Sequence, residues 1–383
     1  MRMSFSTRSL QEDIPNALTR ALGEAKSRGP VLDLTVSNPT TAGIAYDEAA
    51  ILGAFSDPRM LAYEPHPLGL MSARETVAKE IGTDAARIAI TASTSEAYAV
   101  LFKMLCDPGD EILVPAPSYP LLGWLAAFEG VRLAPYPLVY SGRWQVDTIA
   151  LRSAITPRTK AIVVVSPNNP TGSYLGRDEL EAMLDLGLPI VSDEVFAKYP
   201  LGDRVPDDRV ATALDAKRGL VFSLSGLSKL CGLPQMKLGW IAAGGDPLHA
   251  GAAMQRLEIV LDAYLSVGTP VQTALPALLD AGRKAARAIS ERTKKNLAVV
   301  RKALASAPHA TILDVEGGWY VTIRVPETMT DEEWAVTLVS EDAVHVHPGF
   351  FFDLDRGAHL VVSLLTPEDE LAEGMARIAR RIA

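Results

Sequence analysis

A lysine among small and hydroxyl-bearing residues is the strongest chemical signal in the chain. Lys229 stands in the segment 225–229 (SGLSK), after an apolar run that ends near Phe222. A second cation, Lys237, follows eight positions later (237 − 229). A lysine amine that loses its proton can form a covalent imine with a carbonyl, and burial or a neighbouring cation lowers its pKa toward that range. Taken alone, a Ser-Lys pair is common and is typical of a surface loop.

Other polar clusters follow or bracket short apolar runs. The segment 166–172 (SPNNPTG) follows the β-branched run 161–165, and 192–196 (SDEVF) follows the next run. The segments 107–111 (DPGDE) and 116–120 (APSYP) bracket an earlier one. Runs that are apolar at successive positions favour strands covered on both faces, as in a mainly parallel sheet. Ligands bind at the carboxyl ends of such strands, so we expect these clusters to meet there.

The order PSYP, NNPTG, DE and SK closely resembles the class I and II aminotransferases, the fold type I family that depends on pyridoxal 5′-phosphate (PLP). The resemblance runs from about Asp33 to the C-terminal helix. It implies an α/β fold in which a large domain, with a mainly parallel seven-stranded sheet flanked by helices, is joined to a smaller α+β domain. The expected bounds are 1–45 for an N-terminal arm and part of the small domain, 46–270 for the large PLP-binding domain, 271–305 for a connecting helix, and 306–383 for the C-terminal small domain.

The resemblance assigns roles to four residues near the cofactor ring. Lys229 resembles the residue that forms a Schiff base with PLP and moves the proton at the substrate's α-carbon. Asp193 resembles the carboxylate that faces the pyridine nitrogen, where a buried anion keeps the ring protonated and able to accept electrons. Asn169 resembles the asparagine that is hydrogen-bonded to the phenolic oxygen. Tyr119 stands where the family places an aromatic ring against the pyridine face.

The resemblance also implies a phosphate site and a partner subunit. The phosphate is expected at the start of a helix that runs from Glu96 toward Met104, because free N–H groups at a helix N-terminus bind anions. Its expected ligands are Ser93, Thr94, Ser95, Ser228 and Lys237. Tyr63 resembles the tyrosine that the neighbouring subunit donates to the phosphate. This implies a homodimer with shared active sites.

Three cofactor positions depart from the family pattern. Lys237 replaces the usual arginine, which keeps the charge and loses the bidentate fork. Gly226 stands where many relatives have a phosphate-binding serine, and Ser225 would substitute for it if the loop is shifted. Phe196, three positions after Asp193, stands where most relatives have a tyrosine that donates to the phenolic oxygen. Without that donor, the imine is expected to hold its proton to higher pH.

A fourth departure concerns the substrate. Before the final helix the family usually has an arginine that grips the substrate's α-carboxylate, and Val361 occupies that place. A valine cannot bind a carboxylate, so we expect either a substrate other than an ordinary α-amino acid or a non-standard cation. Arg356 is the first candidate, although a solvated arginine in a turn is the simpler interpretation of it. The candidate replacements and further substrate contacts are Arg356, Arg324, Arg20, Ser37 and Asn38.

Composition limits the class of protein and its partners. The chain has 383 residues, a net charge of −9 and 48% apolar residues, which is typical of a globular protein. The negative balance argues against nucleic acid. Two cysteines, Cys106 and Cys231, cannot build a disulfide framework. No apolar run approaches the ~20 residues of a membrane span, and the first 22 residues do not resemble a signal peptide. We expect a soluble cytoplasmic protein that does not contact a membrane.

The histidine pair and several aromatic residues are weaker signals, and structural roles explain most of them. His345 and His347 would share one face of a strand, but no cysteine or carboxylate cluster accompanies them, so we predict no metal site. Proximity to the active site is the better interpretation of the pair. The segment 350–352 (FFF) is substrate wall or core, with core favoured, and Trp124 and Tyr320 have the same ambiguity.

The activity that the resemblance implies is transamination. An amino donor would load the cofactor in one half-reaction, and an oxo acceptor would take the amino group in the second. A PLP-dependent lyase, such as a carbon–sulfur β-eliminating enzyme, is the alternative on the same fold. The missing arginine also keeps open an amino sugar, an amine or a modified amino acid as substrate. A non-catalytic PLP-binding relative is disfavoured because the four ring residues are retained together.

Overall fold

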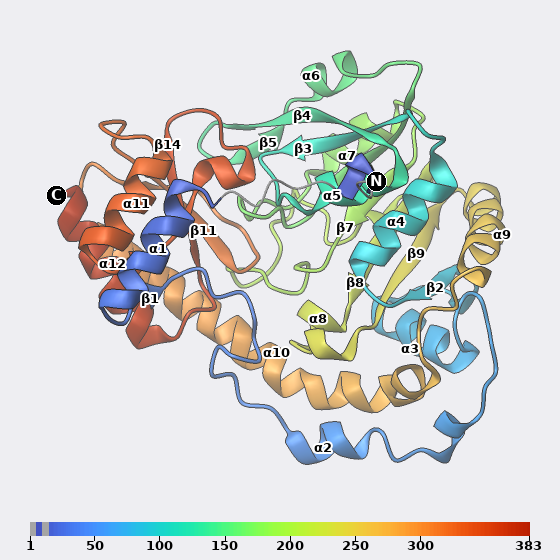
Figure 1. Ribbon diagram of the computed structural model, residues 1–383. Helices are drawn as coiled ribbons and strands as arrows, with labels where there is room; N and C mark the ends of the chain where they lie inside the picture. The colour runs from blue at the N-terminus through green and yellow to red at the C-terminus, as the bar shows by residue number, and fades with distance from the viewer. Residues whose placement is uncertain (1–4, 10–14) are drawn as a thin grey trace, which may run out of the picture.

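The large sheet has eight strands and lies between two layers of helices in a computed structural model that describes residues 5–9 and 15–383 (Figure 1). In spatial order the strands are β2 (Ile88–Thr91), β9 (Gly239–Gly245), β8 (Leu220–Gly226), β7 (Ile190–Asp193), β6 (Thr159–Val165), β3 (Glu111–Ala116), β4 (Arg132–Tyr140) and β5 (Trp144–Val146). The four pairs from β8 to β4 are parallel, and the three pairs at the two ends of the sheet are antiparallel. The expectation of seven strands omitted one, and the three-residue edge strand β5, which folds back on β4, accounts for the difference.

The central strands are apolar on both faces because helices cover both. Phe222 and Leu224 of β8 belong to the cluster that packs against α4 and α9. Val221, one position away, belongs to the cluster that packs against α7 on the other face. The covering helices are α4 (Thr94–Leu105), α5 (Leu121–Glu129) and α9 (Pro247–Asp262) on the first face, and α3 (Met71–Ile81), α6 (Thr148–Ser153) and α7 (Arg177–Leu184) on the second.

A smaller four-stranded antiparallel sheet lies beside the large one (Figure 1). Its strands, in spatial order, are β10 (Thr311–Ile312), β11 (Tyr320–Val325), β14 (Ala358–Ser363) and β13 (His347–Pro348). Helices α1 (Ala17–Arg28), α11 (Asp331–Glu341) and α12 (Glu368–Ile382) pack around it, and β1 (Leu32–Asp33) pairs in parallel with β12 (Val344–His345). The last helix, α12, buries four apolar residues in this core: Leu371, Met375, Ile378 and Ile382.

Helix α10 (Thr269–Leu304) belongs to both regions and includes the helical stretch predicted from Val271. Its first half packs under the large sheet through Leu275 and Leu278, and its second half enters the core of the small sheet through Val300. Buried Asn296 fixes the second half, because its amide donates to the carbonyls of Leu364 and Thr366 at 2.8 and 2.7 Å. The remaining short elements are α2 (Glu48–Gly53), α8 (Leu227–Leu230), η1 (Thr7–Ser9), η2 (Pro58–Leu61), η3 (Ala85–Arg87), η4 (Ala213–Asp215), η5 (Pro234–Met236) and η6 (Gly349–Phe352).

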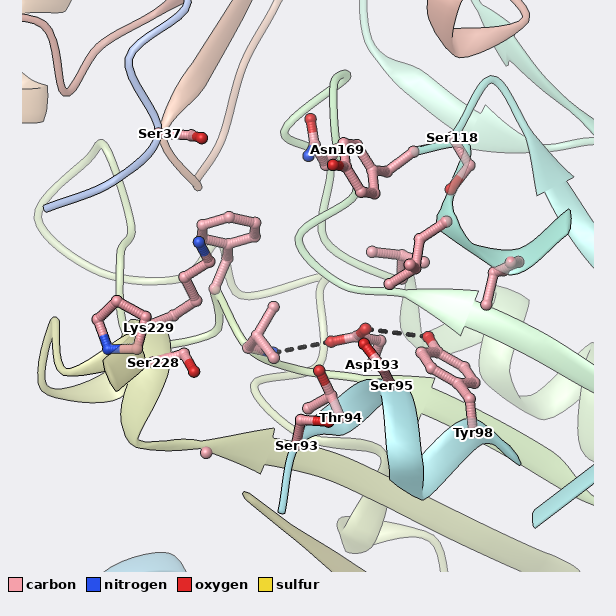
Figure 2. A pocket seen from close by; sticks show the side chains of 18 of the residues that line it. Ser37, Ser93, Thr94, Ser95, Tyr98, Ser118, Asn169, Asp193, Ser228 and Lys229 are labelled. Atoms are coloured by element: carbon pink, nitrogen blue, oxygen red, sulfur yellow. Dashed lines mark hydrogen bonds between the residues drawn. The ribbon is translucent and has the colours of Figure 1, made fainter. Parts of the chain in front are cut away.

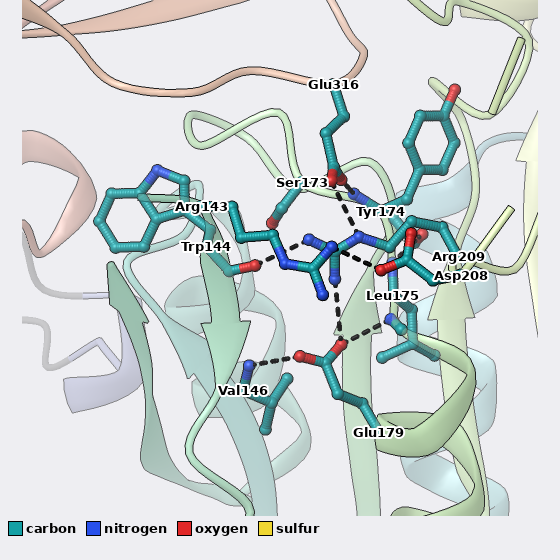
Figure 3. A network of polar contacts seen from close by, with 12 residues as sticks. Arg143, Trp144, Val146, Ser173, Tyr174, Leu175, Glu179, Asp208, Arg209 and Glu316 are labelled. Carbon is teal, nitrogen blue, oxygen red and sulfur yellow. Dashed lines mark hydrogen bonds and ion pairs between the residues drawn. The ribbon is translucent and has the colours of Figure 1, made fainter. Parts of the chain in front are cut away.

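A buried ion network joins the large sheet to the segment that leads into β11 (Figure 3). The guanidinium of Arg209, only 2% exposed, donates to Glu316 at 2.9 Å and lies 3.6 Å from Glu179 of α7. It also donates to the backbone carbonyl of Trp144 at 2.9 Å. The other oxygen of Glu316 accepts from the N–H of Tyr174 at 2.8 Å. The buried guanidinium of Arg209 is thus paired with two carboxylates, those of Glu179 and Glu316. These pairs fix the segment before β11 against the large sheet.

Candidate active site

A cavity of about 540 Å³ lies where β6, β7 and β8 end and the small sheet begins. The last residues of these strands, Val165, Asp193 and Gly226, all line it. Figure 2 shows Lys229 and Asp193 facing one space, with Ser93 on one side and Ser37 on the opposite side. The prediction that polar clusters meet at the carboxyl ends of the strands is therefore confirmed for 116–120, 166–172, 192–196 and 225–229. It is wrong for 107–111, which leads into the start of β3 and does not line the cavity.

Lys229 projects into the cavity from the short helix α8, directly after β8. Its Nζ lies 4.9 Å from the ring centroid of Trp319 and 5.7 Å from that of Phe196. Burial lowers the pKa of Lys229 to about 8, against the opposing effect of the Asp193 carboxylate. The hydroxyl of Tyr199 donates to the backbone carbonyl of Lys229 at 2.6 Å and holds this turn in place. The site thus presents a buried amine that loses its proton near neutral pH.

Asp193 ends β7 and has one hydrogen bond to each carboxylate oxygen (Figure 2). The N–H of Val195 donates to Oδ1 at 3.1 Å, and the hydroxyl of Tyr98 donates to Oδ2 at 3.0 Å. Burial raises the pKa of Asp193 to about 6, while these bonds and Lys229 act in the opposite direction. The carboxyl group therefore titrates at a higher pH than an ordinary aspartate but remains mostly ionised at neutral pH.

Tyr98 is a cavity residue that the sequence analysis did not identify. It lies on α4, and burial and the nearby Asp193 raise its pKa well above the ordinary value, so its hydroxyl keeps its proton and acts as a donor. A signal was available in the sequence. Thr94 was expected at the phosphate and Tyr98 is four positions later, so the two share one face of the helix.

The start of α4 forms an anion site on one side of the cavity. Ser93 caps the helix, and its Oγ accepts from the N–H of Glu96 at 3.1 Å. The first backbone N–H groups of this twelve-residue helix have no partner within the helix, which favours an anion. The expected phosphate ligands Ser93, Thr94, Ser95, Ser228 and Lys237 all line the cavity.

Ser225 does not join this group, contrary to the expectation that it would substitute for a serine at position 226. Successive residues of β8 face opposite sides of the sheet, so Gly226 lines the cavity whereas Ser225 lines a different one beside Glu194. A Cβ on Gly226 would lie 2.8 Å from the carbonyl oxygen of Leu238, directly before the neighbouring strand β9, and 2.9 Å from the Cα of Gly239, its first residue. Close packing of β8 on β9 therefore excludes a serine at 226 unless the backbone moves.

Asn169 and Ser118 carry buried oxygen atoms without a partner. Among the residues that the structure describes, Asn169 Oδ1 and Ser118 Oγ accept or donate no hydrogen bond, and both residues line the cavity. Buried polar atoms are almost always paired, so these two indicate a bound group that satisfies them. Tyr119, half-exposed, lies beside them and packs against Phe352 with ring centroids 6.4 Å apart. A polar aromatic cofactor with a phosphate fits this set of residues.

The opposite wall of the cavity belongs to the small sheet and its neighbouring loops. Its polar members are Thr35, Ser37, Tyr320 and His347, and its apolar members are Phe351 and Phe352. Core was the favoured interpretation of the three phenylalanines 350–352. Phe352 is indeed buried, and it lines the cavity as well, whereas Phe350 is exposed and does not. Ser37, which was expected to contact the substrate, also lines the cavity.

None of the predicted replacement cations reaches the cavity. Arg356 and Arg324 line a separate cavity of about 630 Å³. In the wall of the first cavity, the N–H of Ser118 donates to the carbonyl of Phe352 at 2.9 Å. Arg20 is exposed on α1 and donates to the carbonyl of Pro15. Asn38 is also outside the cavity: its side chain accepts from the N–H and the hydroxyl of Thr40 in a turn.

Val361 lies behind the cavity wall, buried on β14. It pairs with His347 of β13 and packs in a cluster with Phe196, Tyr320 and Phe352, which all line the cavity. Of the described residues that line the cavity, none is an arginine, and the two lysines are on the large-sheet side. The described residues of the small-sheet wall therefore include no arginine or lysine that could bind a carboxylate.

Tyr63 does not reach this cavity from within its own chain. It is 80% exposed and lines a different hollow beside Gln272. Within residues 5–9 and 15–383, no three His, Cys, Asp or Glu side chains gather as a metal site would require. No helix in the same part of the chain is long and apolar enough to cross a membrane.

Comparisons with known proteins agree with this geometry. A model of the family "Aminotransferase class I and II" matches residues 29–378. Tyrosine aminotransferase of Bos taurus is 27% identical over 373 residues, which cover 91% of this chain and 81% of that protein. An S-alkyl-thiohydroximate lyase of Arabidopsis thaliana is 29% identical over 250 residues, or 62% of this chain and 53% of that one.

The fold matches a solved aminotransferase over almost its whole length. Alanine aminotransferase of Pyrococcus furiosus superposes with a TM-score of 0.85 at 26% identity, covering 99% of each chain. An aminotransferase from Escherichia coli gives the same TM-score at 22% identity, with 100% and 98% coverage. From these matches and the family model, the chain belongs to the class I and II aminotransferases, enzymes that depend on pyridoxal 5′-phosphate.

Proposed function

We propose that this enzyme moves an amino group from a primary amine to an oxo acceptor in two half-reactions, with Lys229 as the covalent anchor of PLP. One observation carries the proposal: a buried amine of lowered pKa and a buried carboxylate extend from the ends of neighbouring strands into one cavity. When bound, PLP supplies an electrophilic carbonyl carbon and a ring that accepts an electron pair.

The charged and polar residues of the large-sheet wall would hold the cofactor. The phosphate would bind at the start of α4 with Ser228 and Lys237, where N–H groups, hydroxyls and an ammonium converge. Asp193 would accept a hydrogen bond from the pyridine nitrogen. Asn169 would use its amide to bind the phenolic oxygen, and Tyr119 would lie against the ring face. Each of these residues lines the cavity in this structure.

Lys229 is the residue in position to move the proton. With a pKa of about 8, its amine is partly neutral at physiological pH and accepts the proton that leaves the substrate's α-carbon. The ring centroids of Trp319 and Phe196 lie 4.9 and 5.7 Å from Nζ, so aromatic side chains flank the amine. This arrangement favours a direct transfer between the substrate and one side chain.

Tyr63 would complete the site in a homodimer. The segment before α3 exposes Leu61 and Tyr63, and the neighbouring Leu265 is also exposed, so an apolar surface is available for a second copy. Sedimentation of the protein should give the mass of a dimer, and Leu61→Lys should shift it toward the monomer. Ile149→Lys, which alters an equally exposed apolar residue on α6, is the matched control.

Borohydride trapping tests the proposal directly. The protein is mixed with PLP, reduced, digested and analysed by mass spectrometry, and the cofactor's mass should be found on the peptide that contains Lys229. Label on another lysine, such as exposed Lys198, would overturn the assignment. Similarity to an S-alkyl-thiohydroximate lyase makes elimination the second candidate. Release of ammonia and an oxo acid from a single substrate, without an oxo acceptor, would favour that reaction.

A further inference from the structure

The small-sheet wall of the cavity is built from neutral hydrogen-bonding groups. Thr35 and Ser37 contribute hydroxyls from the segment after β1, and Tyr320 contributes a phenol from the start of β11. Burial raises the pKa of Tyr320 to about 12, so its hydroxyl keeps its proton. His347 adds an imidazole from β13. Four groups that donate or accept hydrogen bonds therefore meet on a wall that carries no arginine or lysine among the described residues.

His347 has a fixed orientation on this wall. Its ring stacks on Phe351, with centroids 5.2 Å apart and an angle of 4° between the planes, and meets Phe352 edge-on at 5.6 Å. Burial and the nearby His345 lower the pKa of His347 to about 4, and Asp33 acts in the opposite direction. The imidazole is therefore neutral at physiological pH and offers one donor and one acceptor.

Val361 leaves His347 as the polar group at this place in the wall. The two residues are cross-strand partners in the antiparallel pair of β13 and β14, so their side chains lie on the same face of the small sheet. Val361 is fully buried, and His347 reaches the cavity. The apolar side chain thus forms the support behind the imidazole.

A carboxylate bound at this wall would lose its hydration without gaining a cation from the described residues of this chain. Lys229 and Lys237 lie on the large-sheet side, where the proposed function commits them to the cofactor. Burial of an unpaired carboxylate is costly, whereas a buried hydroxyl or amide that forms its hydrogen bonds is stable. The wall therefore discriminates by charge, in favour of neutral polar groups.

From this wall we infer that the amino donor carries a neutral hydrogen-bonding group, a hydroxyl or a carboxamide, where an α-amino acid carries its carboxylate, and that His347 recognises this group. The inference rests on the proposed function, because it assumes that the cofactor occupies the large-sheet side. It assigns the enzyme to amino alcohols and amino amides as a substrate class. His347 is its specificity-determining residue.

Matched donors test the inference. The PLP-loaded protein is mixed with L-alanine, L-alaninol or L-alaninamide. A second set consists of L-phenylalanine, L-phenylalaninol and L-phenylalaninamide. The rate of the cofactor's absorbance change is measured for each compound. Within each set, the alcohol and the amide should react at least about tenfold faster than the acid at equal free-amine concentration. Calorimetry with 3-phenylpropan-1-ol and 3-phenylpropanoate, which lack an amine, should give tighter binding of the alcohol.

Variants separate the role of His347 from a general effect on folding. His347→Phe preserves the aromatic stack and should remove most of the alcohol's advantage, whereas His347→Asn keeps hydrogen bonding and should retain part of it. His345→Gln, two residues away and outside the cavity lining, should leave the preference unchanged. Val361→Arg should reverse the preference toward the amino acid. The thermal melting temperature of each variant checks that it is folded.

The outcomes distinguish this inference from the proposed function. If Lys229 is trapped by borohydride and the acid reacts faster than its alcohol and amide, the inference is wrong and the proposed function stands. Failure of every alcohol and amide to react, with Lys229 still trapped, also overturns the inference. If PLP is not trapped on Lys229, the proposed function itself fails. An alcohol preference that His347→Phe leaves intact would refute the role of His347.

Discussion

The two walls of the cavity differ in charge and in the elements that form them. The large-sheet wall has Lys229, Lys237 and the start of α4, all suited to an anion. The small-sheet wall has hydroxyls, an imidazole and phenylalanine rings. A cofactor with a phosphate stays bound through many turnovers, so strong charge pairing serves it. A substrate must leave after each turnover, and neutral hydrogen bonds give selectivity with weaker attachment.

The walls also differ in how the backbone holds them. Asp193 and Gly226 are the last residues of central parallel strands, and Ser93 caps a long helix, so these positions are fixed by the large sheet. His347 belongs to the two-residue edge strand β13, and Ser37 to a loop. We infer from this difference that the cofactor side is the more constrained, and that changes of specificity occur on the other side. Each wall can be tested separately by substitution.

We call the large-sheet wall the charged wall and the small-sheet wall the neutral wall. The largest effect is expected from removal of the reactive amine of Lys229 on the charged wall. Lys229→Ala should reduce the rate of amine-dependent change in cofactor absorbance by about 10³-fold or more, because it removes the proposed covalent anchor and proton carrier from the cavity. Rapid mixing with a saturating amino donor measures the rate. Lys198→Ala, an exposed lysine beyond the end of β7, serves as the control and should react like the unchanged enzyme. A residual rate within tenfold of the original would refute the role of Lys229.

Loss of the second cation on the charged wall should have the next largest effect. Lys237→Gln should weaken PLP binding by about 10- to 100-fold, because a hydrogen bond to a charged group contributes about 1.5–3 kcal/mol. Fluorescence titration of the cofactor-free protein measures the dissociation constant. Pyridoxal, which lacks the phosphate, should bind equally to both proteins. An equal loss for both compounds would mean that Lys237 supports the fold of the loop instead of the phosphate.

Much of the charged wall was predictable because its residues follow the strands in order. Runs that are apolar on both faces indicated the central strands, and the strand-end rule then brought Asp193, Asn169 and Lys229 together. The helix-start rule found Ser93 in the same way. These rules need only local sequence and the general form of a parallel sheet. The family resemblance added the chemical roles, which remain proposals for the individual residues.

The rest required register and packing, which one sequence does not contain. Ser225 and Gly226 are neighbours on β8, and only the pleat of the strand decides which of them faces the cavity. Arg356 and Arg324 approach each other only because the small sheet brings their separate segments to one hollow. The pairing of His347 with Val361 depends on the register between β13 and β14. These non-local relations determine the neutral wall, so the sequence predicted it poorly.

A smaller effect is expected at Tyr98, which extends from α4 to Asp193 on the charged wall. Tyr98→Phe removes the donor to Asp193 Oδ2, a bond that favours the ionised carboxylate, so the pKa of Asp193 should rise above about 6, by about one unit. Carbon NMR of the labelled carboxyl group in the cofactor-free protein measures this pKa. Tyr136→Phe is the matched control, because that equally buried hydroxyl donates to the carbonyl of Val163 instead. A fall in the pKa of Asp193 would contradict the geometry.

The smallest effect is expected at Phe196, where the two walls meet. Its ring lines the cavity and packs edge-on against Trp319 and Tyr320, with centroids 5.2 and 6.4 Å away. Phe196→Tyr would add a hydroxyl toward the cofactor's phenolic oxygen, where a donor stabilises the negatively charged form. The pH at which the bound cofactor's absorbance changes should therefore fall, by less than about one unit.

A spectrophotometric pH titration of the loaded protein measures that change. Tyr320→Phe is the matched control, because it alters a hydroxyl of the neutral wall and should leave the midpoint where it was. A midpoint that stays unchanged or rises in Phe196→Tyr would mean that position 196 faces the substrate side alone. The size of the shift thus measures how far the charged wall extends toward the neutral one.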